Sequence, residues 1–167
     1  MAKLKSEVWQ KKYDAQGIPT RDRFVRDSAK MAARFSGPLA KTINAIQKTT
    51  LFRSTLEKTL GIEKERILPT YAAQPFFKWF ANRKKQPTTT APKVVLFADT
   101  YLNYHEPNIG IAATQLLEGL GFEVILANIG CCQRPKISQG FLRDAKKEGT
   151  AMAVSYTHLT LPTIYSV

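Results

Sequence analysis

Hydrophobic and polar residues change their period along the chain, and this change marks an α/β unit in its second half. KVVLFA (93–98) and FEVILA (122–127) are short apolar runs rich in β-branched residues, a pattern typical of strands buried on both faces. Apolar residues recur at helical spacing between them: Ile109, Ala112, Ala113, Leu116, Leu117 and Leu120. Pro107 suits the first turn of that helix and Gly121 its C-terminal stop. Strand, helix and strand with short connections predict parallel strands and a right-handed crossover.

The first 62 residues follow a helical pattern of modest amphipathicity. Residues 3–16 lack helix breakers, and Gly17-Ile18-Pro19 follows them. We expect a second helix from Thr20, as its N-cap, through Phe35. A break at Gly37-Pro38 precedes further short helices, which a C′ glycine at Gly61 brings to a stop.

These patterns predict an α/β chain with four parts. Residues 1–81 form a helical connector that ends in an aromatic, proline-containing stretch, and residues 82–92 form a polar linker. Residues 93–153 form a partial parallel-sheet domain. Because Pro135 does not let a helix continue from the preceding residues, its last helix is predicted over residues 137–148.

The last segment, residues 154–167, has no continuity with the helix pattern before it. A back-translation of VSYTHLTLPT (154–163) resembles a common transposon-based sequencing adapter. We therefore expect read-through rather than evolved protein here, and His158 is not counted among the candidate ligands.

The net charge of +12 is unevenly distributed. Residues 1–92 carry 19 of the 25 Lys and Arg side chains and the whole cationic excess. Such a region can face nucleic acid, anionic lipid or an acidic protein, or form a solvated helical surface. FFKWFANRKK (76–85) interleaves aromatic and cationic residues, which keeps open the alternative of a basic binding module for nucleic acid or an acidic protein partner.

The two cysteines, Cys131 and Cys132, are adjacent in GCCQRP (130–135), just beyond the carboxyl end of the second predicted strand. The predicted loop at residues 99–105 follows the first strand at the same edge. Open α/β sheets bind ligands at this edge. The absence of a framework of cysteines indicates a reducing compartment, and no run of about 18 apolar residues or secretory signal is present. We expect a cytoplasmic location.

Adjacent cysteines favour metal chemistry over a disulfide. The ring that they would close is strained, and the redox spacing C-x-x-C is absent. Thiolates suit zinc, copper or an iron–sulfur cluster, each of which needs about four ligands. The other candidate ligand type is histidine, at His105 and His158. Two readings stay open for the pair, incidental cysteines and metal ligands, and the position at the sheet edge favours the second.

The region from Lys93 to Gly149, which contains VVLFADTYLNYHEPNIG and GCCQRP, resembles the cysteine-rich (CCG) domain of iron–sulfur oxidoreductases. The resemblance is strongest to FAD-linked oxidases of the D-lactate dehydrogenase type and to the glycolate oxidase iron–sulfur subunit. LFRSTLEKTLGIEKERILPTYAAQPFFKWF is similar to the connector between the ferredoxin-like and CCG parts of such proteins.

The resemblance implies that Cys131 and Cys132 are ligands of an iron–sulfur cluster, of the [4Fe–4S] type. The family pattern adds an upstream cysteine, which falls here near Asp99 and Thr100, and a distal C-x-x-C beyond residue 153. Gln133 replaces the family's glycine. The resemblance therefore implies an incomplete cluster site in a fragment that is inactive alone.

The parent protein implied by the resemblance is an enzyme that passes electrons from a lactate- or glycolate-like hydroxy acid to an acceptor. FAD belongs to the parent only, and no catalytic residue is expected in this chain. The expected partners are ferredoxin-like and flavin domains or subunits, with a peripheral contact at the inner face of the membrane or with an electron acceptor, and no nucleic acid.

Overall fold

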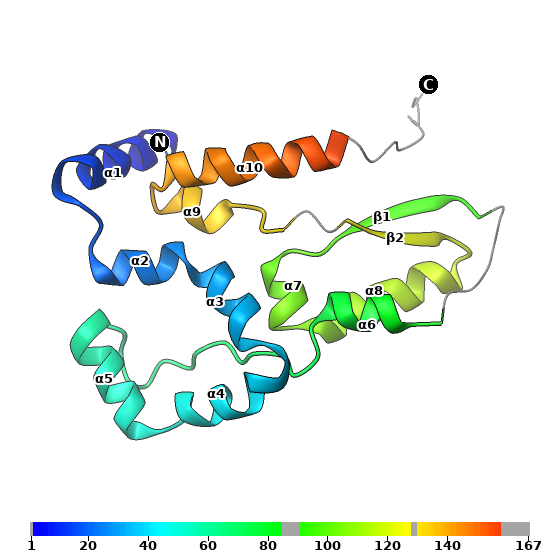
Figure 1. Cartoon of the computed structure of the whole chain (residues 1–167), viewed down its shortest axis with the longest axis horizontal. Coiled ribbons are helices and arrows are strands. Elements are labelled where there is room, and N and C mark those ends of the chain that lie inside the picture. The colour runs from blue at the N-terminus through cyan, green and yellow to red at the C-terminus, as the bar shows by residue number, and fades with distance from the viewer. Residues whose placement is uncertain (1, 85–90, 128–129, 158–167) are drawn as a thin grey trace.

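The computed structural model describes residues 2–84, 91–127 and 130–157. It confirms an α/β chain in which a helical first part precedes a small parallel sheet (Figure 1). The helical part consists of α1 (Ala2–Gln16), α2 (Thr20–Arg26), α3 (Ser28–Phe35), a 3-10 turn (Gly37–Leu39), α4 (Ala40–Gln47) and α5 (Thr50–Leu60). The second part consists of α6 (Phe76–Asn82), β1 (Lys93–Phe97), α7 (Thr100–Tyr104), α8 (Pro107–Gly119), β2 (Glu123–Ala127), α9 (Arg134–Ser138) and α10 (Leu142–Thr157).

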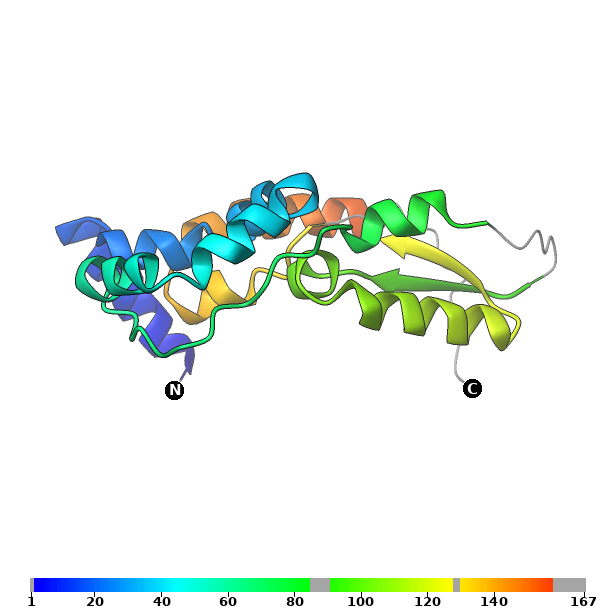
Figure 2. The same cartoon turned by 90° about the horizontal axis from the view of Figure 1, so that it is seen from below.

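The predicted βαβ unit is confirmed. Strands β1 and β2 pair in parallel, from Lys93 opposite Glu123 to Phe97 opposite Ala127. Helix α8 connects them and contacts β2, and α6 packs beside α8 (Figure 2). Both strands therefore end at the same edge, as the sequence predicts. No helix in the described ranges combines the length and the apolar character needed to cross a membrane.

The core of the second part forms where α6, α7 and α8 meet. Phe76 is fully buried there, and a Cβ at Gly110 would lie 2.8 Å from its ring and 2.7 Å from Leu102. Gly110 is thus required by a close approach. Thr114, also fully buried, donates from Oγ1 to the Gly110 carbonyl at 2.8 Å.

The buried face of α8 differs from the apolar stripe that the spacing marks out. Ile109, Leu116 and Leu120 are 54%, 65% and 65% exposed, whereas Gly110 and Thr114 face inward. Small residues let α6 come close to α8, and this contact decides which side is buried.

Helix α1 packs against the far end of the chain, on α9 and α10. The rings of Tyr13 and Phe141 stack with centroids 4.9 Å apart. A Cβ at Gly140 would collide with Cβ of Trp9 and approach the Ser6 carbonyl oxygen to 2.9 Å. A residue without a side chain is therefore needed where this turn meets α1.

Three predicted boundaries are wrong. The helix predicted from Thr20 to Phe35 is divided at Asp27, because the Asp27 side chain is held by Arg26 (2.8 Å) and Lys30 and aspartate is a weak helix former. Its N-cap is Pro19, not Thr20. The helix predicted over residues 137–148 is instead α9 and α10, because Pro135 lies in the first turn of α9 and Gly140 (φ 83°) ends the turn between the two helices.

The backbone of α10 continues through Thr157, so part of the predicted tail is helical. The rest of that tail, with His158, lies outside the described residues. The polar linker predicted over residues 82–92 includes residues 85–90, which also lie outside them.

Candidate metal-binding site

Two backbone positions in the left-handed region shape the cysteine loop. Gly130 has φ 79° with open space around it, and Gln133 has φ 59° as the N-cap of α9. Between them, Cys131 and Cys132 carry free thiols and are both half-buried. The loop begins three residues after the carboxyl end of β2. Its sharp turns hold two thiols at the sheet edge where ligands bind in open α/β folds.

Gln133 fastens this loop from below. Its side chain is buried, at 5% exposure for the residue, and Nε2 donates to the Cys131 carbonyl at 3.0 Å. Its other amide atom, Oε1, is buried without a hydrogen-bond partner among the described residues. The left-handed backbone at this position also gives a physical reason for the glycine that the resemblance places here.

A buried ion pair lies next to Gln133. Lys136, whose side chain is 5% exposed, bonds to the Glu148 carboxylate from α10. Burial alone would raise the pKa of Glu148, but the hydrogen bond and charge of Lys136, with a smaller contribution from Gln133, lower it. The charge of Lys136 also helps to lower the pKa of Asp27, mainly set by its bond from Arg26. The pair therefore joins the loop to α10 and α3.

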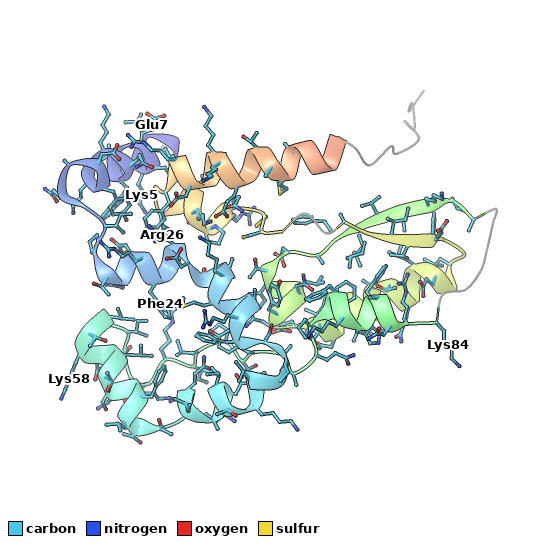
Figure 3. The ribbon with its side chains drawn as sticks, viewed as in Figure 1. Lys5, Glu7, Phe24, Arg26, Lys58 and Lys84 are labelled. Carbon is cyan, nitrogen blue, oxygen red and sulfur yellow. The ribbon has the colours of Figure 1, made fainter. Side chains whose placement is uncertain are left out.

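Cys132 lines a groove of about 790 Å³ between α1, α9 and α10. The groove wall is mostly apolar, with Ile137, Leu142 and Ala145 among its members, and Arg134 and Lys146 add positive charge. Glu7, labelled on α1 in Figure 3, lines the same groove. The thiol of Cys132 is thus accessible to a group that approaches from outside the chain.

His105, the other described candidate ligand, has a different role. Its Nδ1 lies 2.8 Å from the Thr70 carbonyl oxygen, and its ring packs against Tyr71 and Tyr101. Within the described ranges, no three His, Cys, Asp or Glu side chains are grouped to hold a metal ion. The structure therefore brings the two cysteines together without His105.

The segment predicted as a ligand-edge loop is helical instead. Asp99 is the N-cap of α7, and its Oδ1 accepts a hydrogen bond from the Leu102 N–H at 2.9 Å. The signal was present in the sequence as an aspartate directly after a strand. Neither Asp99 nor Thr100 offers the thiolate that the family pattern has near this point.

The donor set fits part of an iron–sulfur site and not a whole one. A [4Fe–4S] cluster is held by about four thiolates, whereas this chain has two cysteines. Their half-buried thiols, one of them in an open groove, suit ligands that share a cluster with other donors. No step of a reaction can be assigned to these residues alone.

The aromatic–basic stretch is used for packing in the described residues. Phe76 is fully buried and packs against Trp79 and Phe80. Arg83 lies 3.4 Å from the centre of the Phe80 ring and pairs with Glu118 at 3.0 Å. These aromatic rings and this guanidinium are engaged within the protein, so they do not form a stacking surface for nucleic acid.

Comparison with curated proteins shows that the chain is similar to an anaerobic glycerol-3-phosphate dehydrogenase subunit of Escherichia coli strain K12, with 28% identity over 138 residues. The corresponding protein of Escherichia coli O157:H7 gives the same identity. The match covers 82% of this chain and 35% of each relative, so the chain spans little more than a third of their length. No family model matches the chain, and no solved structure matches it. The similarity supports the coarser part of the resemblance, namely a subunit of an oxidoreductase.

Proposed function

We propose that this chain is part of an iron–sulfur subunit of an oxidoreductase and that Cys131 and Cys132 are two ligands of its cluster. The observation that carries the proposal is the placement of two free thiols in one loop beyond the parallel strands. The similarity to a dehydrogenase subunit supports it independently. When bound, an iron–sulfur cluster supplies one-electron transfer.

The remaining ligands come from outside these 167 residues in this proposal. The resemblance implies an upstream cysteine and a distal C-x-x-C, and this chain contains neither. The groove beside Cys132 gives such donors room to approach. Gln133 and the Lys136–Glu148 pair hold the loop in place from the protein side.

The proposed activity of the parent protein is the oxidation of a small anionic alcohol. The resemblance favours a lactate- or glycolate-like hydroxy acid, whereas the name of the relative states glycerol 3-phosphate. Both kinds of molecule carry a hydroxyl group that is oxidised to a carbonyl group. FAD would be bound by a part outside this chain, and ferredoxin-like and flavin parts are the expected partners.

Anaerobic reconstitution with iron and sulfide tests the two-ligand proposal. An external thiol such as dithiothreitol can supply the missing thiolates, so the 167-residue chain should retain a cluster only when that thiol is in excess. About four irons per chain and the visible absorption and EPR signals of a [4Fe–4S] cluster are expected under that condition. Little iron is expected without the thiol.

The Cys131→Ser/Cys132→Ser double variant should retain no cluster under either condition, whereas the Ser138→Ala control should behave as the unchanged chain. Iron retention by the double variant would contradict the assignment of these ligands. About four irons per chain without an external thiol would contradict the claim that the chain supplies only two of them.

A further inference from the structure

A second cavity, far from the cysteines in sequence, lies in the helical part. It has a volume of about 330 Å³ and is enclosed by α2, α3, α4, α5 and the segment 68–71. Phe24, labelled in Figure 3, points from α2 into this region. The volume lies within the usual range of small-molecule sites. The chemistry of its wall is uniform enough to define the kind of ligand that it fits.

Its wall is apolar and aromatic. Phe24, Phe35, Phe52 and Tyr71 all line the cavity, and the rings of Phe35 and Tyr71 meet edge to face with centroids 5.6 Å apart. None of the described residues in the wall is Asp, Glu, Lys or Arg. A charged ligand would lose its hydration without gaining a counter-ion, whereas an uncharged aromatic ring would pack face or edge against these side chains.

One end of the cavity carries hydrogen-bonding groups. His105 lines it there, and Nδ1 of His105 lies 2.8 Å from the Thr70 carbonyl oxygen. A carbonyl oxygen only accepts, so Nδ1 carries the hydrogen, and Nε2 of the neutral ring is then an acceptor. The ring of His105 also lines a neighbouring cavity of about 280 Å³, which includes Thr70 and Glu106. A ligand that donates a hydrogen bond at this end is matched by the acceptor on the imidazole.

The walls are fixed before any ligand binds. Asn44 of α4 makes two hydrogen bonds of 2.8 Å to the backbone of Tyr71, one as donor and one as acceptor. The next residue, Ala72, donates to the Tyr104 carbonyl at 2.7 Å and accepts from Gly37 at 2.8 Å. The segment that closes the cavity is thus tied to α4, to α7 and to the turn after α3, and a preformed site loses little entropy on binding.

We propose that this cavity binds an uncharged aromatic compound of one or two rings that carries a hydroxyl group, with the ring among the phenylalanines and the hydroxyl group donating to Nε2 of His105. The cavity shares no described lining residue with the cysteine groove. The proposal therefore stands or fails separately from the iron–sulfur assignment.

Calorimetric titration of the 167-residue chain with 2-naphthol tests this site, and 2-methylnaphthalene serves as the probe without a donor. We expect one molecule of 2-naphthol per chain, bound about fivefold more tightly than 2-methylnaphthalene, which is the usual gain from one hydrogen bond. In His105→Phe the two probes should bind with the same affinity. Equal affinities in the unchanged chain would overturn the role of His105.

Two substitutions fill the cavity from different helices, Ser28→Leu on α3 and Ile46→Trp on α4, and each should weaken 2-naphthol binding at least tenfold. Ser138→Leu is the matched control, since Ser138 lines the cysteine groove instead. Far-UV circular dichroism identifies any variant that fails to fold, in which case the other one decides. Unchanged binding in a folded filled variant, weakened binding in Ser138→Leu, or more than one molecule bound per chain would overturn the proposal.

Discussion

Among the described residues, Gln133 is the one non-glycine side chain on a left-handed backbone, with φ 59°. This position separates backbone preference from side-chain contacts, because Gln133→Gly and Gln133→Ala remove the same amide. Both variants lose the 3.0 Å bond to the Cys131 carbonyl and both remove the buried, unpaired Oε1. Only the alanine variant keeps a Cβ in the left-handed region.

The side-chain contributions nearly cancel. A lost hydrogen bond costs about 1 kcal/mol, and removing an unpaired buried acceptor returns about 1–3 kcal/mol. Glycine adopts the left-handed region without a steric penalty, whereas a residue with a Cβ pays about 1–2 kcal/mol. We therefore expect Gln133→Gly to be more stable than Gln133→Ala by about 1 kcal/mol and at least as stable as the unchanged chain.

Urea unfolding followed by circular dichroism measures these differences in the free energy of unfolding. Gln139, the C-cap of α9, is a matched control because it is exposed and has φ −96°. At Gln139 the order should reverse, since glycine there only adds entropy to the unfolded chain. If Gln133→Ala equals or exceeds Gln133→Gly in stability, the left-handed geometry of the cysteine loop is refuted.

Three further substitutions test other parts of the fold. Burial, together with the charge of Asp22 and a 3.2 Å hydrogen bond to it, raises the pKa of Tyr13 from 10.0 to about 12; the stability that this gives is complete below pH 10 and is lost as the pH rises towards 12, so Tyr13→Phe should lose less stability than the unchanged chain between urea titrations at about pH 9.5 and about pH 11.5. Asp99→Ala removes the N-cap of α7 and should cost about 1 kcal/mol in the same urea assay, with Asp99→Asn close to neutral. Gly110→Ala should cost about 1–3 kcal/mol because its Cβ would meet the Phe76 ring, and a coincident Phe76→Leu change should recover part of this loss.

The parallel strands and their common edge followed from the sequence because they depend on local patterns. The β-branched runs and the intervening helical period specify a βαβ unit without any distant contact. The position of the two cysteines followed from that unit. The stripe of α8, by contrast, predicted the helix and not its buried side, since the side is chosen by the approach of Phe76 to Gly110.

Other features depend on contacts between segments far apart in the chain. The Lys136–Glu148 pair would be expected to be solvated by its residue types, and it is buried only because α10 folds back over α9. His105 is drawn away from the cysteines by Thr70, 35 positions earlier. A sequence pattern has no period that reports such pairs.

The contact between α1 and the last two helices bears directly on the cysteines. Gly140 can form its turn only without a side chain because Trp9 and Ser6 lie against it, and this turn sets how α10 passes over α9. The passage of α10 brings Glu148 to Lys136, and these two residues lie beside Gln133, which holds the Cys131 carbonyl. The helical first part is thus a structural support of the cysteine loop. Removing α1 should therefore loosen the loop even though none of its residues is a candidate ligand.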